Sequence, residues 1–367
     1  MTEISRANDS NGHDLQATGI PRPVCIAGMH RSGASTVTRL LGICGLSLGP
    51  VEDLLPASDD NPDDQWGENR SLTRVNDAIL RSFGGGWDLV PDFPSTWTTA
   101  PELLGTRAEA SRLLDMFDGQ PSWGWSDART SLTSPFWRDL LPNLTMVVCL
   151  RNPVEVATSF ARSGGASPQF SYDLWLRYNR SVLAHTSPRT RVVTHVDSWF
   201  ADPDAELRRI CSRLGIEVTD AARTEALATI QQGPLQCSAT LGDLVNADDM
   251  RAEVITTYQL LCNEAGSVYQ QVAARELIAL DQTLPEADDE GTSWAQRWRG
   301  QQFETMSREL LRRVVQAEGS LGELVGQLTS KEHELARLRQ QVSQLNSSAT
   351  SVSSGRVKHH NDAAGAA

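Results

Sequence analysis

Short apolar runs alternate with longer amphipathic stretches over the first two-thirds of the 367-residue chain. Buried strands are predicted at residues 23–28, 145–150 and 191–196. Helical periodicity is predicted at residues 34–44, 71 onward, 101–117, 153–163, 171–186 and 203–214. Strands that alternate with helices are typical of a mostly parallel sheet with helices on both faces, so the pattern predicts an α/β fold.

Two regions depart from this alternation. Glycine and proline are frequent over residues 81–97, which predicts a surface loop. From residue 216 to 300 the hydrophobic pattern is weaker, and helices are expected there. Residues 1–20 and 347–367 are polar or rich in small residues and are predicted to be disordered.

The C-terminal part carries a heptad pattern. One apolar series repeats every seventh residue, at Val314, Leu321, Leu328, Leu335 and Val342. A second series interleaves with it, at Ala317, Leu324, Lys331, Leu338 and Leu345. A repeat near 3.5 residues favours a coiled coil over residues 303–346, and therefore a homo-oligomer, over a single amphipathic helix packed on the globular body. The domain prediction is then an α/β domain over residues 21–300 followed by this coiled coil.

Charge and cysteine content narrow the function classes. The net charge of −13 argues against general nucleic-acid binding and against adhesion to anionic membranes. Because no run of eighteen apolar residues exists, no membrane span is expected. The 6 cysteines lack metal-binding spacing, which favours free thiols in a reducing cytoplasm.

The stretch GMHRSGAS, residues 28–35, predicts an anion-binding loop between the first strand and the following helix. Gly28 and Gly33 have the spacing of a phosphate-binding loop, whose backbone N–H groups point inward at the N-terminus of a helix. An ATPase loop needs lysine where Ala34 stands, whereas here the basic residues are His30 and Arg31, inside the loop.

The second predicted strand ends in Arg151, where nucleotide-hydrolysing relatives of such loops commonly place an aspartate for magnesium. A cation at this edge of an open α/β sheet is expected to hold an anion directly, together with Ser159 on the next helix. The alternative is that Arg151 is an ordinary surface arginine.

Several motifs together resemble the sulfotransferases that use 3′-phosphoadenosine 5′-phosphosulfate (PAPS), and most closely the bacterial carbohydrate-type members. GMHRSGAS resembles their GMHRSGTS loop, and LRNPVEVATSF resembles their LRxPxxVAxSL segment. WGWSDARTSLTSPFW is similar to WGxKDPRxxxxxPFW, and the stretch from Asn61 to Leu80 resembles a third family segment. The resemblance spans about residues 22–215.

The resemblance implies a P-loop, Rossmann-like fold and metal-free transfer of a sulfuryl group from PAPS to an acceptor hydroxyl or amine. It implies that Arg31 stabilises the leaving oxygen, with His30 also near the sulfuryl group. Arg151 and Ser159 are implied to bind the 3′-phosphate. The residues implied to surround the 5′-phosphate are Gly28, Ser32, Gly33, Ala34, Ser35 and Thr36.

Glu68 matches a family glutamate and is the candidate general base for the acceptor. Asp63 and Asp64, if near it, are expected to raise its pKa. The alternative is one solvated acid in an acidic loop. A saccharide or glycolipid acceptor is expected because indole rings stack on sugars. Five tryptophans fall in segments expected around the acceptor: Trp66, Trp87, Trp97, Trp123 and Trp125.

Two departures from the family pattern keep other functions open. Ala34 replaces a threonine, and Ser126 replaces a lysine. Asp127, next to Ser126, matches the family and is expected to form an ion pair with Arg129, either in a structural role or at the site. A non-catalytic scaffold for a glycan-assembly complex is therefore an alternative. A P-loop kinase is a second, opposed by Ala34 and by the missing strand-end aspartate.

Overall fold

The computed structural model describes residues 22–55, 67–230, 239–247, 250–283 and 331. The chain divides into two units, Met1–Trp298 and Arg299–Ala367, and only the first is described beyond a single residue. The predicted coiled coil and both predicted disordered ends therefore lie outside the described residues, apart from Lys331, which is helical.

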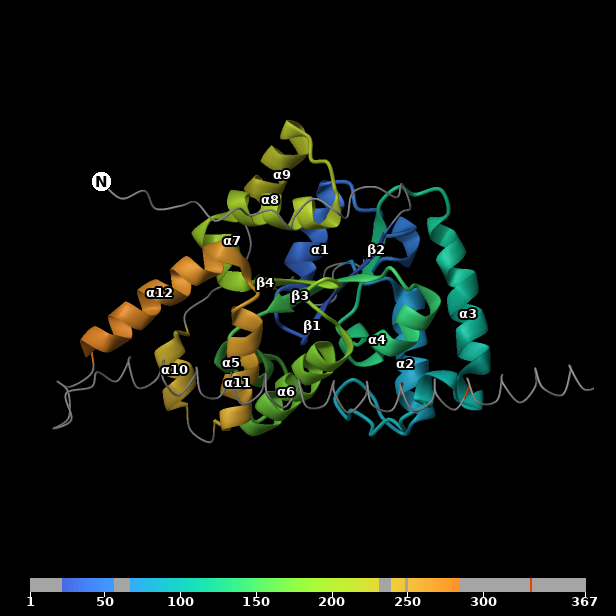
Figure 1. Ribbon diagram of the computed structural model, residues 1–367, viewed down its shortest axis with the longest axis horizontal. Coiled ribbons are helices and arrows are strands. Elements are labelled where there is room, and N and C mark those ends of the chain that lie inside the picture. The colour runs from blue at the N-terminus through green and yellow to red at the C-terminus, as the bar shows by residue number, and fades with distance from the viewer. Residues whose placement is uncertain (1–21, 56–66, 231–238, 248–249, 284–330, 332–367) are drawn as a thin grey trace, which may run out of the picture. The chain divides into compact units, whose positions relative to one another are not determined.

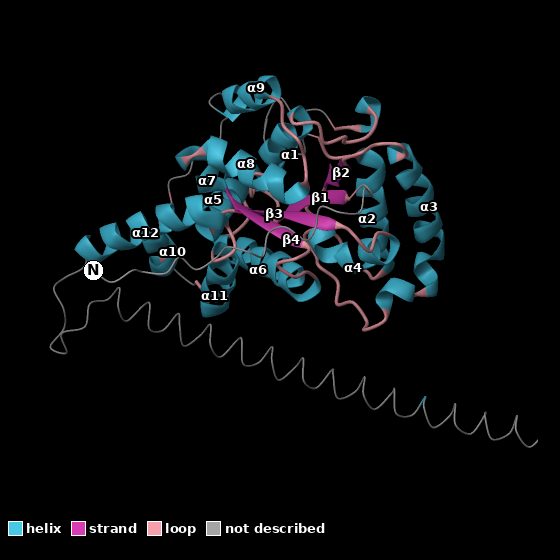
Figure 2. Ribbon diagram, turned by 45° about the horizontal axis from the view of Figure 1, so that its top comes forward, coloured by secondary structure: helices cyan, strands magenta, loops and turns pink. Residues whose placement is uncertain are grey.

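A four-stranded parallel sheet forms the centre of the first unit (Figure 2). Its strands are β1 (Pro23–Gly28), β2 (Trp123–Ser126), β3 (Thr145–Leu150) and β4 (Arg191–His195), in the order β2-β1-β3-β4. The three strands predicted from apolar runs are confirmed. β2 was not predicted, and it pairs with β1 so that Ser126 lies opposite Ile26.

Helices cover both faces of the sheet, as predicted (Figure 1). Along β1 the side chains alternate, so Val24 and Ile26 pack with one core cluster while Cys25 and Ala27 pack with the other. The first face is covered by α1 (Ala34–Ile43), α8 (Pro203–Leu214) and α9 (Asp220–Ile230). The second is covered by α4 (Thr130–Leu140), α5 (Pro153–Gly164) and α6 (Pro168–His185).

The remaining elements extend these layers. They are α2 (Arg70–Ser82), α3 (Leu104–Leu114), α7 (Val196–Ala201), α10 (Leu241–Asn246), α11 (Ala252–Cys262) and α12 (Gly266–Thr283). The helix expected over residues 101–117 is α3 flanked by the 3-10 turns Pro101–Leu103 and Asp115–Phe117. Within the described part of the chain, no helix combines the length and apolarity that a membrane span requires.

Local sequence signals set where the helices begin. Asn152 accepts the N–H of Val154, and Pro153 occupies the first turn of α5. Ser167 caps α6 in the same way ahead of Pro168. Proline suits this position because its missing N–H has no partner in a first helical turn. The start of α5 is thereby fixed directly after β3, at the edge where Arg151 lies.

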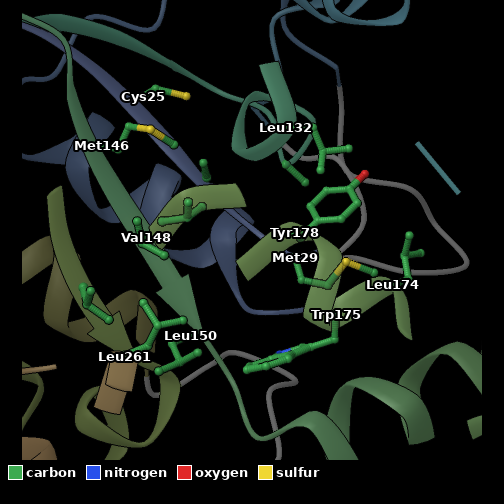
Figure 3. Packing of buried hydrophobic residues seen from close by; sticks show 14 of the residues in the cluster. Cys25, Met29, Leu132, Met146, Val148, Leu150, Leu174, Trp175, Tyr178 and Leu261 are labelled. Atoms are coloured by element: carbon green, nitrogen blue, oxygen red, sulfur yellow. The ribbon is translucent and has the colours of Figure 1, made fainter. Parts of the chain in front are cut away.

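The larger core cluster fills the space between the sheet and α4, α6 and α11 (Figure 3). Met29, in the loop after β1, is fully buried there with Tyr178 and Trp175 of α6. The anion-binding loop is therefore anchored by a large apolar side chain, which limits the positions that its neighbours His30 and Arg31 can take.

Candidate functional site

The loop after β1 has the backbone geometry of an anion site. Gly28 has φ +128° and lies so close to β3 that an added Cβ would meet the carbonyl oxygen of Cys149 at 2.3 Å. Arg31 has φ 69°, and Gly33 has φ 83°. Such left-handed residues let consecutive N–H groups turn to the same side of the loop.

The N-terminus of α1 adds a positive end to this loop. Gly33 gives α1 no side-chain cap, and no acidic residue occupies its first turn. The N–H groups of that turn, which include those of Ser35 and Thr36, have no acceptor within the helix. The Ser32 hydroxyl is buried without a hydrogen-bond partner, which a bound oxyanion would supply. The loop therefore fits a phosphate or phosphosulfate group.

Arg151 joins this loop to the end of β3. Its Nη1 donates to the carbonyl oxygen of Arg31 at 3.2 Å, and its Nε lies 2.7 Å from Oε2 of Glu155. The interpretation of Arg151 as an ordinary surface arginine is wrong, since its side chain is only 11% exposed. Ser159 lies half-buried on α5, about two helical turns further along the chain.

The strand order explains why these residues meet. β1 lies between β2 and β3. The connection after β1 leads to β2 on one side, and the connection after β2 leads to β3 on the other side, so a topological switch point lies between β1 and β3. Ligands of open α/β sheets bind outside the carboxyl ends of the strands at such a point. The loop of Arg31 follows β1, and Arg151 follows β3.

His30 lies among aromatic rings beside the loop. Its ring centroid is 5.0 Å from that of Trp87 and 5.8 Å from that of Tyr178. Burial, with the nearby charges of Arg129 and Arg31, lowers the pKa of His30 to about 3. The imidazole is therefore neutral near pH 7, and His30 would act as a hydrogen-bonding group rather than as a cation.

Glu68 is buried against the same part of the sheet. Glu68 forms an isolated parallel β-bridge with Ser126 of β2. The preceding residue, Gly67, lies close to α1, because an added Cβ there would meet the Thr38 side chain at 2.9 Å. The expectation of a solvated acid in a loop is wrong, because Glu68 is 7% exposed. Arg129 is a charged neighbour of Glu68, at 3.5 Å, whereas Asp63 and Asp64 lie outside the described residues.

Arg129 and Asp127 form the expected ion pair, with Nη1 of Arg129 2.9 Å from Oδ1 of Asp127. Burial raises the pKa of Asp127, and Arg129 opposes that effect. Burial alone would lower the pKa of Arg129, but Asp127, Glu68 and Asp77 together raise it. The guanidinium therefore stays charged.

Of the tryptophans expected around the acceptor, only Trp87 lies half-buried at the site among the described residues. Its ring stacks on Phe160, with centroids 6.2 Å apart, and its carbonyl accepts from the Tyr178 hydroxyl at 2.8 Å. The expectation is wrong for the three that are buried in the core: Trp97, Trp123 and Trp125. Trp66 is outside the described residues.

Sequence reasoning missed several residues that complete the site. Glu155 holds Arg151, and its position four residues later on a helix is a usable signal. Asn76 and Tyr178 carry no local signal, because their partners are more than fifty residues away. Asp77 has a local partner in Arg81, but its contact with Arg129 spans 52 residues. Among the described residues, no group of three or more His, Cys, Asp or Glu side chains is arranged to hold a metal ion.

Comparison with known proteins gives matches at the level of structure. No protein-family model and no curated protein sequence matches the chain. A sulfotransferase from Mycobacterium tuberculosis matches with 17% identity and a TM-score of 0.38, over 65% of this chain and 76% of that one. A sulfotransferase from Alicyclobacillus acidocaldarius matches with 15% identity and a TM-score of 0.37, over 71% and 99%.

A mouse sulfotransferase complexed with PAP matches with 10% identity and a TM-score of 0.33, over 74% of this chain and 86% of that one. These matched structures are sulfotransferases, the family that the sequence motifs resemble. At such identities and scores they add no residue-level information.

Proposed function

We propose that the chain is a sulfotransferase that uses PAPS as its donor. The observation that carries the proposal is the hydrogen bond from Arg151 to the Arg31 carbonyl, 3.2 Å long. It brings a cation from the end of β3 to an anion-binding loop that lacks the lysine of ATPases. A donor with one phosphate at the loop and a second one nearby suits this arrangement.

The donor supplies an activated sulfuryl group, and the residues of this chain bind it and balance charge. The backbone from Ser32 to Thr36 would hold the 5′-phosphate, and Arg151 with Ser159 would hold the 3′-phosphate. Arg31 lies in the loop at the place where charge develops on the leaving oxygen. A preorganised cation at such a point stabilises the transition state more than the ground state.

Glu68 is the proposed general base. Transfer forms one S–O bond to the acceptor oxygen and breaks one S–O bond to the leaving oxygen, while the acceptor proton passes to Glu68. Its burial beside the α1 helix supports this role, because a base must lie within hydrogen-bond reach of the proton that it takes. Neutral His30 would donate or accept a hydrogen bond at the same place.

The proposed acceptor is a hydroxyl of a saccharide or glycolipid. Trp87 supports this choice, because its half-buried indole lies beside His30 and is backed by Phe160. Aromatic rings provide apolar area for the C–H faces of sugars. We further propose a cytoplasmic homo-oligomer formed through residues 303–346, and light scattering of the full chain against a chain ending at residue 300 tests the oligomer.

A ligand-binding experiment tests the donor. Adenosine 3′,5′-bisphosphate is expected to raise the melting temperature in the presence of EDTA, whereas ATP with magnesium is expected to leave it unchanged. The reverse result would replace the sulfotransferase with a P-loop kinase.

A transfer experiment tests the chemistry. Labelled PAPS is incubated with the chain and a panel of saccharides, and labelled products are separated. Glu68→Gln is expected to abolish transfer and to retain donor binding, and Glu253→Gln, at an exposed position on α11, is the matched control. Donor binding without transfer to any acceptor would favour the scaffold, an alternative that Ser126 keeps open.

A further inference from the structure

A buried charge cluster adjoins the proposed base and includes one residue that the sequence motifs do not contain, Asp77 of α2. The Arg129 side chain is 7% exposed and contacts three carboxylates. Its Nη1 is 2.9 Å from Asp127 and 3.5 Å from Glu68, and its Nε is 2.9 Å from Asp77. One cation is therefore shared by three acids.

Two of the three acids are held firmly. Asp127 accepts both the backbone N–H and the Nη1 of Arg129, and its second oxygen accepts from Asn76 at 2.7 Å. Asn76 is fixed in turn, because its Oδ1 accepts from Thr133 and from the Trp137 indole. Asp77 forms an ion pair with Nε of Arg129 without a hydrogen bond, and its second oxygen lies 3.3 Å from Nη2 of Arg81. Asp77 and Asp127 thus both attract the Arg129 guanidinium.

Of the three carboxylates, Glu68 lies farthest from Arg129. The net charge of the cluster shows why this distance matters for the protonation of Glu68. If these four groups and Arg81, which lies 3.3 Å from Asp77, are all ionised, the cluster carries a net charge of −1. Like charges that share a site make one of them accept a proton more readily. Arg129 lies closer to Asp127 and Asp77 than to Glu68, so among the three carboxylates it stabilises the ionised form of Glu68 least.

The other titratable groups near Glu68 do not compete for this role. Tyr178 of α6 remains a neutral phenol, because burial raises its pKa well above the ordinary value. His30 in the loop is neutral near pH 7. Asp88, in the exposed loop, acts on Tyr178. Arg129, Asp127 and Asp77, together with Arg81 that pairs with Asp77, are charges of this cluster that act on the protonation of Glu68.

We propose that Asp77 is a positioning residue that draws the Arg129 guanidinium away from Glu68 and thereby keeps Glu68 basic enough to accept the acceptor's proton. The catalytic half of this statement rests on the proposed function. The electrostatic half, that Asp77 controls the titration of Glu68, stands independently of it.

A direct titration tests the electrostatic half. The chain is labelled with ¹³C at glutamate carboxyl carbons, and the Glu68 signal is assigned by its loss in Glu68→Gln. In Asp77→Asn the titration midpoint of Glu68 is expected to fall by about one pH unit, because a like charge is removed and Arg129 turns toward Glu68. Asp139→Asn, which removes another acid paired with an arginine (Arg107), is expected to leave the midpoint unchanged.

A pH–rate profile tests the catalytic half. In Asp77→Asn the acid limb of kcat/KM is expected to move to lower pH by the same amount, and the plateau kcat to fall by about threefold because the base is weaker. Asp77→Glu restores the charge and is expected to recover most of the wild-type profile. Binding of adenosine 3′,5′-bisphosphate is expected to be unchanged in both variants.

The two halves fail separately. An unchanged or raised midpoint of Glu68 in Asp77→Asn overturns the inference, even if the wild-type chain transfers sulfate. A lowered midpoint in a chain that transfers nothing supports the control of Glu68 by Asp77 and removes the proposed function instead.

Discussion

Nη1 of Arg151 donates to the backbone carbonyl oxygen of Arg31 at 3.2 Å, across 120 residues of sequence. Nε of the same side chain is held by Glu155 at 2.7 Å. Because both contacts are within the protein, the guanidinium is oriented before a ligand arrives. Preorganisation of this kind lowers the entropic cost of binding an anion.

Arg151→Gln is therefore expected to weaken binding of adenosine 3′,5′-bisphosphate by about 10-fold to 100-fold, the worth of a charge-assisted hydrogen bond. Isothermal titration calorimetry measures it. Adenosine 5′-monophosphate, which lacks the 3′-phosphate, is expected to lose much less. Arg162→Gln, an exposed position on α5, is the control. Equal losses for both ligands would show that Arg151 does not read the 3′-phosphate.

Gly28→Ala is expected to destabilise the fold by several kcal/mol, about the upper range for single substitutions. The new Cβ would lie 2.3 Å from the carbonyl oxygen of Cys149, a backbone atom that cannot move without shifting β3. Gly165→Ala is the matched control, because its φ is also positive and nothing lies within 4 Å. It is expected to cost about 1 kcal/mol. Urea unfolding of both variants measures the difference, and similar losses would contradict the close approach.

His195, at the end of β4, is fully buried and has both ring nitrogens engaged. Nε2 is 2.8 Å from the Tyr258 hydroxyl, and Nδ1 accepts the N–H of Asp197 at 3.2 Å. Burial, with a smaller effect of Arg151, lowers the pKa of His195 to about 3. The unfolded state therefore binds a proton near pH 6.5 that the folded state does not bind.

The free energy of unfolding should consequently fall as the pH falls from 7 to 5, and His195 alone should account for about 2 kcal/mol of that loss. In His195→Gln the loss between these two pH values is expected to be smaller by that amount. Denaturant titrations at both pH values measure it. An unaltered pH dependence in His195→Gln would mean that this imidazole titrates in the folded state.

Trp87→Ala is expected to raise the KM for a saccharide acceptor by about 5-fold, since one aromatic face is worth about 1 kcal/mol. Binding of adenosine 3′,5′-bisphosphate should change little. Leu89→Ala is the control, because Leu89 lies in the same loop and is 68% exposed. If the acceptor KM is unchanged while kcat falls, Trp87 serves to position His30 rather than to bind sugar.

The central part of the fold could be predicted because its signals are local. The apolar runs of β1 and β3 are continuous and bounded by glycine or proline, and Asn152–Pro153 marks the start of α5. β2 escaped prediction since it has only 4 residues, one of them Gly124. Gly124 is needed there because a Cβ would meet the Val24 carbonyl oxygen at 2.1 Å.

The parts of the site that escaped prediction depend on contacts distant in sequence. Asp77 and Arg129 are 52 positions apart, and nothing near either one specifies the other. The tryptophan prediction failed for a related reason. Trp123 and Trp125 both lie on β2 and are buried, and residue type alone does not distinguish a core indole from one at a ligand site.

Glu155 is shared between two neighbours. One carboxylate oxygen holds Arg151, and the other accepts the N–H of Ala239, just before α10. Asn152 strengthens the same attachment by donating to the Thr240 carbonyl at 3.1 Å. The arginine of the proposed donor site and a distant stretch of chain therefore share one anchor. Sequence drift around Ala239 is consequently a route by which evolution can retune donor affinity without altering any residue of the phosphate-binding loop.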